Sequence, residues 1–376
     1  MMQVSRADTS TVGRWWWTVD RWTLAALLTL IGFGYVMMLA ASPAVAERIG
    51  AASRNMFFMR QIAYLALAAS VMVLVSMLTV KQVRLLAWLG LGGALVMVAA
   101  TLVVGAEIKG ARRWISLPGI GSLQPSEFLK PCFAVVAAWL ITEGKLNRRH
   151  GATVLAVLLF ITSAVLLQRQ PDIGMLLVVA AVFFAQFFVA GLNMMVVFVA
   201  AAGGLAAAVG AYFAFPHVQS RVQRFLDPNA DNYQAEVALE AFGNGGLLGR
   251  GPGEGRIKNV LPDAHADFVF AVAGEEFGLV VCLVILALFA FVVVRGLVRL
   301  LGETDLFVVL ACAGLLTQFG LQSFINMAST LHLIPTKGMT LPFVSYGGSS
   351  VVAIALGMGM LLALTRRRLS RTEEDR

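Results

Sequence analysis

The sequence predicts an all-α integral membrane protein, a polytopic bundle of about ten transmembrane helices with a large loop between the seventh and eighth helices. Of the 376 residues, 59% are hydrophobic and only 13% are charged, whereas soluble domains carry about 25% charged residues. Uncharged runs of about 20 residues, the length that crosses a bilayer, recur along the whole chain. We therefore expect residues 1–376 to form a single transmembrane domain.

These runs define the spans, and one run is too long for a single crossing. No charged residue lies between Ile173 and Pro216. As one helix this segment would extend about 66 Å at 1.5 Å per residue, so we place a turn at Gly191–Asn193. The predicted spans are 22–41, 61–80, 85–104, 126–142, 151–168, 173–190, 194–215, 268–294, 305–328 and 346–365.

The first span imitates a secretory signal peptide. Arg14 and Arg21 precede an apolar segment that ends in Ala44-Val45-Ala46, a pattern typical of cleavage sites. The uncharged run before that pattern is, however, longer than the usual signal core of about 7 to 15 residues. We interpret it as a retained first helix.

Ten spans place both termini on one side of the membrane, and the basic residues indicate which side. With the amino terminus in the cytoplasm, 15 of the 29 Lys and Arg residues lie inside. Five of the other 14 lie in the long loop, where charge has little influence on orientation. The sequence therefore predicts cytoplasmic tails at 1–21 and 366–376 and an extracytoplasmic loop at 216–267.

The three cysteines all lie in apolar runs. An odd number of cysteines in such places argues against a disulfide framework and against a zinc site. We therefore expect Cys132, Cys282 and Cys312 to be small buried side chains.

Basic residues on the predicted outer face form two clusters. Guanidinium groups match phosphate oxygens through their planar fork of donors, so the clusters favour an anionic, phosphorylated ligand. Contact with lipid headgroups is the alternative, and Trp114 is equally well explained as an interfacial anchor. The clusters are Lys109, Arg112, Arg113 and Lys130 around the third-to-fourth connection, and Arg221, Arg224, Arg250, Arg256 and Lys258 in the long loop.

The stretch from Asn259 to Gly278 carries carboxylates into an apolar run. Asp267 lies at the boundary, and Glu275 and Glu276 follow about two helical turns further on. An unpaired carboxylate there would cost several kcal/mol. Two interpretations stay open: an acid/base centre at the mouth of a membrane-embedded cavity, or a helix capped by Asp267 and by the aspartate four residues before it.

A helix that begins at Gln124-Pro125-Ser126-Glu127 carries a second charged pair. Glu127 and Lys130 are i, i+3 neighbours on one face, and ion pairs inside a membrane bundle usually mark function. Lys130 would orient or stabilise Asp267 if the two helices adjoin.

Residues 168–172 form a polar island between two apolar runs. A turn there needs only Pro171 and Asp172. Arg169 is surplus to that purpose, so we treat it as a candidate ligand-binding residue.

Two further segments are irregular. The glycine-dense run 243–255 lacks the Gly-Lys-Ser/Thr ending of a nucleotide-binding loop, and we interpret it as mobile backbone that can approach a ligand. Residues 335–350 contain two prolines and three glycines and cannot be a regular helix. Broken backbone at membrane depth is tolerated where it lines a cavity or is buried in protein, and its hydroxyls would suit a sugar.

Five motifs, in order, resemble those of the SEDS family (shape, elongation, division and sporulation). They cover nearly all of the predicted spans, and Pro335-Thr336-Lys337-Gly338 resembles the division member more than the elongation member. The motifs are Ala111-Arg112-Arg113-Trp114, Gln124-Pro125-Ser126-Glu127 with Lys130, Leu261-Pro262-Asp263-Ala264-His265 with Asp267, Gly274-Glu275-Glu276, and residues 342–350.

The resemblance implies a peptidoglycan glycosyltransferase that polymerises lipid II and releases undecaprenyl diphosphate. It implies work with a class B penicillin-binding protein and other divisome membrane proteins in the bacterial cytoplasmic (inner) membrane, at the division septum. Lipid II and membrane lipids are the expected ligands, and nucleic acid is not. A divalent cation, Mg²⁺ or Mn²⁺, stays open.

The same resemblance implies roles for residues. Asp267 matches the family's essential aspartate and would be the general base, and Lys130 matches the lysine that faces it. Ala266 departs from the threonine that the family commonly has at this position, so a hydrogen bond beside the base cannot be assumed. The expected substrate-binding residues are Arg112, Arg113, Trp114, Gln124, Glu127, Arg169, Asp172, Arg224, His265, Glu275, Glu276, Lys337, Ser345, Tyr346 and Ser349.

Three other functions stay open. The chain is also compatible with an elongation polymerase, and with a transporter or flippase of lipid-linked precursors, which would likewise need buried charge and broken helices. A protein that only organises partners would need no intramembrane carboxylates. Glycan synthesis in detergent, where no flipping is needed, separates the first two classes.

Overall fold

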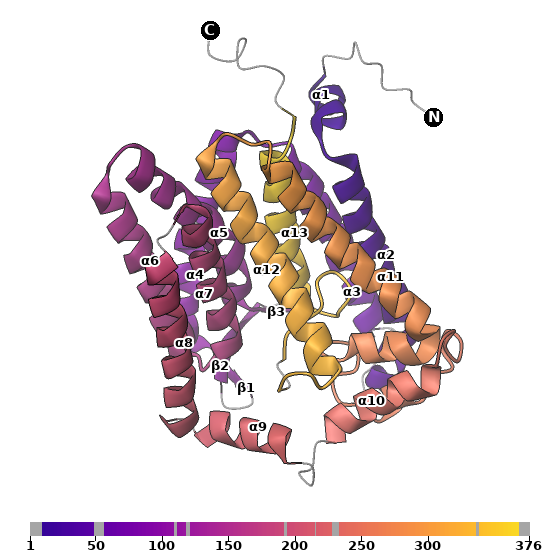
Figure 1. Cartoon of the computed structure of the whole chain (residues 1–376). Helices are drawn as coiled ribbons and strands as arrows, with labels where there is room; N and C mark the ends of the chain where they lie inside the picture. The colour runs from indigo at the N-terminus through magenta and orange to yellow at the C-terminus, as the bar shows by residue number, and fades with distance from the viewer. Residues whose placement is uncertain are drawn as a thin grey trace.

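The structure, a computed structural model, is a bundle of helices with both chain ends at one end of the bundle (Figure 1). We call that end the terminal end. The opposite end, which carries helix α10 and a small sheet, is the loop end. The structure describes residues 10–48, 56–108, 111–117, 121–191, 194–214, 216–227, 233–335 and 338–367.

Each of the ten predicted spans coincides with a helix. Six of these helices, α2, α3, α4, α6, α11 and α12, are long and apolar enough to cross a membrane within the described part of the chain, so the chain is an integral membrane protein. Ten crossings stay a prediction. The helices are α2 (Arg21–Arg48), α3 (Met56–Ser76), α4 (Val80–Val104), α5 (Pro125–Leu146), α6 (His150–Arg169), α7 (Ile173–Val189), α8 (Met194–Ala214), α11 (Val269–Leu300), α12 (Leu306–Thr330) and α13 (Gly348–Leu364).

The connections contain more regular structure than the sequence indicated. An antiparallel sheet of order β1-β2-β3 joins α4 to α5, although we expected only helices. Two of its strands are only three residues long, and the seven residues of the other, Ala111–Leu117, do not alternate apolar and polar side chains. The additional elements are α1 (Thr11–Thr18) in the expected amino-terminal tail, β1 (Ala106–Ile108), β2 (Ala111–Leu117), β3 (Gly121–Leu123), and, in the long loop, α9 (Pro216–Leu226), α10 (Tyr233–Gly245) and the 3₁₀ turn η1 (Ile257–Asn259).

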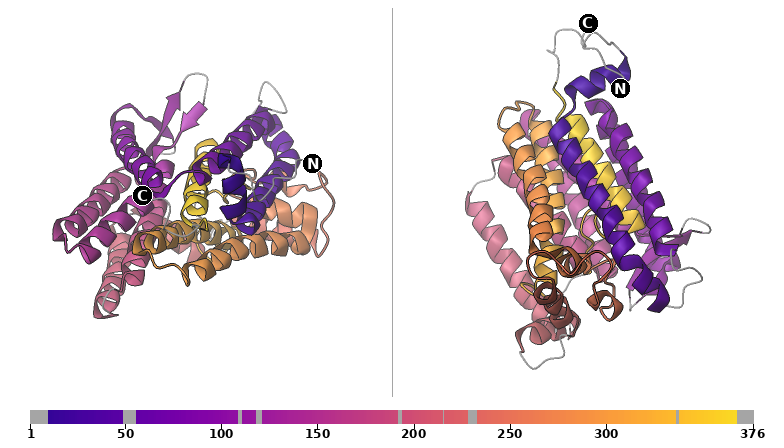
Figure 2. Two further views of the ribbon diagram at one scale, coloured as in Figure 1. Left: turned by 90° about the horizontal axis from the view of Figure 1, so that it is seen from above. Right: turned by 90° about the vertical axis from the view of Figure 1, so that its right-hand side faces the viewer.

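Helix α12 is largely enclosed by protein. In its membrane-length window 72% of residues are buried, against 17% for α6 and 28% for α11. It packs against α5, α7, α11 and α13, and the view along the bundle places α13 near the middle (Figure 2). A helix that faces protein on all sides can carry polar residues at membrane depth, because its neighbours supply their partners.

Helix α11 breaks at Gly278, which has φ +77° and ψ −177°. In Figure 1 the first part of α11 lies at an angle to the rest of the helix. The N–H groups of Leu279 and Val280 donate to the carbonyls of Gly246 and Leu247 (2.9 and 3.2 Å). A Cβ at Gly278 would lie 2.3 Å from the Gly249 nitrogen. Only glycine therefore fits this position, by conformation and by space.

The glycine-dense segment supplies the hydrogen bonds that the broken helix lacks. The N–H groups of Arg250 and Gly251 donate to the carbonyls of Glu275 and Glu276 (2.9 and 3.0 Å). We expected a mobile loop that approaches a ligand. The structure corrects this, because the close approach of its backbone is to α11 itself.

At the terminal end, Asp20 joins the first and last thirds of the chain. It is 2% exposed and accepts hydrogen bonds from Arg295 at 2.8 to 3.1 Å, while Arg299 Nε lies 3.2 Å away. Burial alone would raise the pKa of Asp20, but the hydrogen bonds from Arg295 and Thr23 and the charge of Arg299 hold that pKa below its ordinary value.

We expect Asp20→Asn to lower the free energy of unfolding by about 1 to 3 kcal/mol, because two guanidinium groups lose their carboxylate. Since the folded pKa is lowered, the parent's advantage is present at neutral pH and disappears as pH falls below about 4. Thermal unfolding of the detergent-solubilised protein at pH 7 and at acidic pH measures both effects. Glu254→Gln, an exposed carboxylate, is the control; an equal change in both variants would contradict the assignment.

Candidate active site

The polar residues of interest meet where the start of α11, the second half of α12 and the segment between α12 and α13 come together. That segment, residues 331–347, is non-helical where it is described, which confirms the prediction of broken backbone. Leu341, Phe343, Val344 and Ser345 within it have no exposed surface. The break is therefore buried in protein, where neighbouring groups can satisfy its backbone.

Asp267 lies half-buried just before α11. The helix starts at Val269 with Phe268 at the N-cap position, so Asp267 is not its N-cap residue. Its carboxylate faces Gly338: a Cβ there would lie 3.1 Å from Asp267 Oδ2. The backbone at Gly338 thus approaches the carboxylate so closely that a side chain there would crowd it.

Two elements hold the backbone of Asp267 in place. Asn326 of α12 donates from Nδ2 to the carbonyls of Asp267 (2.9 Å) and Met339 (2.6 Å). Ser345 donates from Oγ to the carbonyl of Ala266 (2.6 Å) and accepts from the Leu341 N–H (2.8 Å). We expected Ser345 to bind substrate; because its hydroxyl is buried and bonded on both sides, the structure gives it this internal role instead.

Lys130 is 2% exposed and is held by two partners. Its Nζ lies 2.8 Å from Glu127 Oε2, which shows that the i, i+3 pair forms inside the bundle, and it donates to Gln322 Oε1 at 2.8 Å. Gln322 in turn donates to the Thr340 carbonyl at 3.2 Å. Lys130 therefore reaches the segment that faces Asp267 through Gln322, and buried Glu127 neutralises its charge.

An aromatic cluster lies beside Asp267. His265 and Tyr346 have ring centroids 5.1 Å apart, and Phe57 of α3 lies 5.2 Å from His265 and 5.4 Å from Tyr346. The Tyr346 N–H donates to the His265 carbonyl at 2.9 Å. Two predicted residues thus come together, with Phe57 as a neighbour that the sequence did not indicate.

Arg113 docks the sheet onto the polar turn between α6 and α7. It donates to the carbonyls of Gln170 (3.0 Å) and Pro171 (2.6 Å) and lies 3.6 Å from Asp172 Oδ2. Asp172 also accepts from Gln124 (3.4 Å) and caps α7. We predicted that Arg113, Asp172 and Gln124 bind substrate; their geometry is that of a structural joint.

Arg112 differs from its neighbour in the chain. Its side chain is 49% exposed and pairs across the strands with exposed Glu107 at 3.3 Å, a pair that is worth little in solvent. Trp114 is half-buried on the same strand, and Arg169 is exposed at the end of α6. Arg112 and Arg169 are therefore the described arginines of the predicted set that are open to an incoming anion.

Glu275 and Glu276 have no exposed surface. Glu275 accepts from the N–H groups of Arg256 and Ile257 (2.9 and 3.0 Å). Glu276 pairs with Lys258 at 2.6 Å and accepts from the Gly253 N–H at 2.8 Å. Both were predicted to bind substrate, and that role stays a prediction; in the structure the two carboxylates hold the loop of residues 250–258 onto α11.

Two predicted residues, Lys337 and the side chain of Arg224, lie outside the described residues. Ser349, in the first turn of α13, is 7% exposed. Among the described side chains, no group of three or more His, Cys, Asp and Glu is placed to hold a metal ion, and a divalent cation stays a prediction.

Asn326, Gln322 and Thr340 were missed by the sequence analysis. A signal for two of them was present, because Gln318, Gln322 and Asn326 recur every four residues in an apolar run and so share one helix face. All three side chains of that face are buried.

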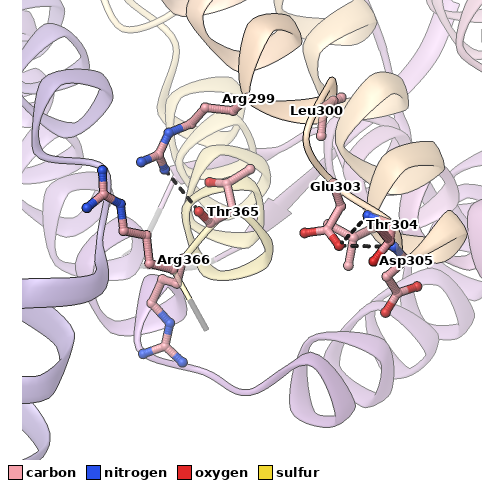
Figure 3. A pocket seen from close by; sticks show the side chains of 9 residues that line it. Arg299, Leu300, Glu303, Thr304, Asp305, Thr365 and Arg366 are labelled. Atoms are coloured by element: carbon pink, nitrogen blue, oxygen red, sulfur yellow. Dashed lines mark hydrogen bonds between the residues drawn. The ribbon is translucent and has the colours of Figure 1, made fainter. Parts of the chain in front are cut away.

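A hollow at the terminal end is separate from this site. It has a volume of about 450 Å³ and lies between the α11–α12 turn and the end of α13. Arg299 and Arg366 lie on one side of it and Glu303 and Asp305 on the other (Figure 3). Because Asp267 precedes α11 and Arg299 ends it, the length of that helix separates the two places.

Comparison with known proteins places the chain in a family. Residues 21–370 match the model of the FtsW, RodA and SpoVE cell cycle proteins. A relative from Caulobacter vibrioides, named probable peptidoglycan glycosyltransferase FtsW, is 43% identical over 97% of this chain and 93% of its own length. One of the same name from Halomonas elongata is 36% identical over 91% of this chain and 89% of its own.

Solved structures agree. A chain from work on "Structural coordination of polymerization and crosslinking by a peptidoglycan synthase complex" has a TM-score of 0.78 and 29% identity, covering 92% of this chain and 97% of that one. The rod shape determining protein RodA of Thermus thermophilus has a TM-score of 0.67 and 27% identity, covering 93% and 97%. These matches confirm the resemblance drawn from the five motifs, and the chain belongs to the FtsW/RodA/SpoVE family of cell cycle proteins.

Proposed function

We propose that this protein is a peptidoglycan glycosyltransferase that polymerises lipid II at the outer face of the cytoplasmic membrane, for the septal wall during cell division. The observation that carries the proposal is the half-buried carboxylate of Asp267, held by its backbone against the glycine-lined segment that follows α12. The names of the relatives from C. vibrioides and H. elongata support it.

In this reaction Asp267 acts as general base. It removes the proton from the acceptor sugar hydroxyl, whose oxygen forms a bond to the anomeric carbon of the donor. The bond from that carbon to the lipid diphosphate breaks, and the diphosphate leaves with the electron pair. The leaving group needs charge neutralisation more than a proton, so one carboxylate suffices.

Charge neutralisation falls to arginines at the loop end. Arg112 and Arg169 are exposed there, and Arg224 belongs to the same proposal by its place in the chain. Lys130 does not contact the substrate in this proposal, because its ammonium group pairs with Glu127 and donates to Gln322. Its role is to set the position of the segment that faces Asp267.

The proposed setting follows from family and charge. Both termini lie in the cytoplasm, the loop end faces outward, and the protein works at the septum with a class B penicillin-binding protein and other divisome membrane proteins. Such a partner is supported by the structural relative from a peptidoglycan synthase complex that coordinates polymerisation and crosslinking. Polymerisation of labelled lipid II in detergent by the purified complex tests the activity and excludes flipping as its cause.

Asp267→Asn should abolish polymerisation while leaving the protein folded. General-base catalysis contributes about 10²- to 10⁴-fold in rate, whereas the amide keeps the size of the side chain. The measurement is the rate of glycan synthesis by the purified complex, with size-exclusion profile and Tm as folding controls. A monodisperse variant that polymerises within about threefold of the parent would remove Asp267 from the catalytic role.

Arg112→Ala and Arg113→Ala should have different effects, the first on the rate of polymerisation and the second on Tm. Arg112→Ala should leave Tm unchanged and slow polymerisation about tenfold or more, because an exposed cation for the diphosphate is lost. Arg113→Ala should lower Tm, because the sheet loses its bonds to the α6–α7 turn. Parallel Tm and initial-rate measurements decide, and normal turnover in Arg112→Ala would reduce it to a surface residue.

Depletion of the protein in cells distinguishes a role in division from a role in elongation. Depletion of the protein from its own host should give filaments with blocked septa, because septal glycan would be missing. Microscopy of depleted cells is the measurement. Rounded cells that continue to divide would support the elongation alternative.

A further inference from the structure

Asn326 lies on the enclosed helix α12 and has no exposed surface. It is one turn beyond Gln322, so both side chains leave the same face of the helix. Gln322 contacts Lys130 and Asn326 contacts the backbone of Asp267. A single face of α12 therefore contacts the Lys130 ammonium group and the backbone that carries the Asp267 carboxylate.

The side-chain amide of Asn326 uses both of its N–H groups. Nδ2 lies 2.9 Å from the Asp267 carbonyl and 2.6 Å from the Met339 carbonyl. The opposite amide orientation would set Oδ1 against two carbonyl oxygens, so the hydrogen-bond network fixes the assignment. Oδ1 itself has no hydrogen-bond partner among the described residues, so what the buried amide contributes here is its two donors.

The two carbonyls belong to segments that face each other across the site. Asp267 precedes the first turn of α11, and Met339 follows Gly338, whose Cβ position lies 3.1 Å from Asp267 Oδ2. A shift of either segment changes the gap between the carboxylate and the backbone at Gly338. Asn326 joins both segments to a third, enclosed element, and sites held by rigid elements keep their geometry more closely than sites on loops.

We propose that Asn326 is a positioning residue for the general base: its amide ties the backbone of Asp267 to that of Met339 and so sets where the Asp267 carboxylate lies when it meets the acceptor sugar hydroxyl. This inference rests on the proposed function. Loss of the amide lets the carboxylate shift relative to the bound hydroxyl, and a misplacement of about 1 Å can reduce a rate about 10²-fold. Binding of the lipid donor, which depends on other groups, stays unchanged.

Asn326→Leu tests the proposal, because leucine has the same number and branching of side-chain heavy atoms and has no donor. In the purified complex with its penicillin-binding partner, we expect kcat for lipid II polymerisation to fall about 10- to 100-fold, with KM within about threefold of the parent. Amide hydrogen exchange of residues 338–347 should become about tenfold faster. Hydrogen exchange shows whether residues 338–347 are still held to α12, and this measurement does not depend on activity.

Ser323→Ala is the matched control. Ser323 is buried on the same helix, but its hydroxyl bonds within that helix, to the Phe319 carbonyl. We expect kcat and the exchange of residues 338–347 to match the parent in this variant. If Asn326→Leu is not monodisperse, Asn326→Ser, which keeps one hydroxyl donor, takes its place with a smaller loss of kcat.

The outcomes separate the two proposals. An inactive parent complex, or an active Asp267→Asn variant, would overturn the proposed function. An active parent and an inactive Asp267→Asn variant, together with a normal kcat in the Asn326 variant, would overturn the positioning role alone. So would a fall in Tm and a rise in KM that account for the lost activity, since both would indicate a structural role.

Discussion

The structure depends on one constraint: inside a membrane, each backbone N–H and C=O must find a partner within the protein. The chain breaks regular helix twice near the loop end, at Gly278 and between α12 and α13. At the first break, backbone N–H and C=O groups of the glycine-dense segment form hydrogen bonds with the free backbone groups of the helix. At the second, Asn326 and Ser345 take part of that role. The irregular backbone around Asp267 persists because these groups are satisfied.

The same constraint explains why polar residues gather on α12. A helix that faces lipid cannot carry Gln318, Gln322 and Asn326 without leaving amides unpaired, whereas α12 is enclosed by its neighbours. From one face of α12, Gln322 therefore reaches Lys130 and Asn326 reaches the segment before α11. Lys130 and Glu127 form a buried ion pair that carries no net charge. The centre of the bundle is thus polar where the proposed chemistry needs a fixed frame.

Much of this architecture could be predicted from the sequence, because uncharged runs report membrane helices directly. The sheet could not be, since β1 and β3 are three residues long and β2, although seven residues long, does not alternate apolar and polar side chains. Residue roles were harder still. Arg113 and Glu275 look like ligand-binding groups in sequence, and only the fold shows that turn carbonyls and loop N–H groups occupy them. Asp267 and Lys130 drew attention as charged residues at an apolar run and their roles were assigned by family resemblance, whereas the link through Gln322 required the packing of α5 on α12.

The break at Gly278 divides α11 into two mechanical parts. The part before it is bonded to residues 250–258 through Glu275 and Glu276, and it continues directly from Asp267. The part after it belongs to the bundle and ends at the Asp20 ion pairs. Leu247 and Leu248, 68% and 81% exposed, lie in the glycine-dense segment, and the carbonyls of Gly246 and Leu247 accept from Leu279 and Val280 just after the break. The glycine-dense segment is thus bonded to α11 on both sides of Gly278, so it sets the angle between the two parts of the helix and with it the direction in which the chain arrives from Asp267.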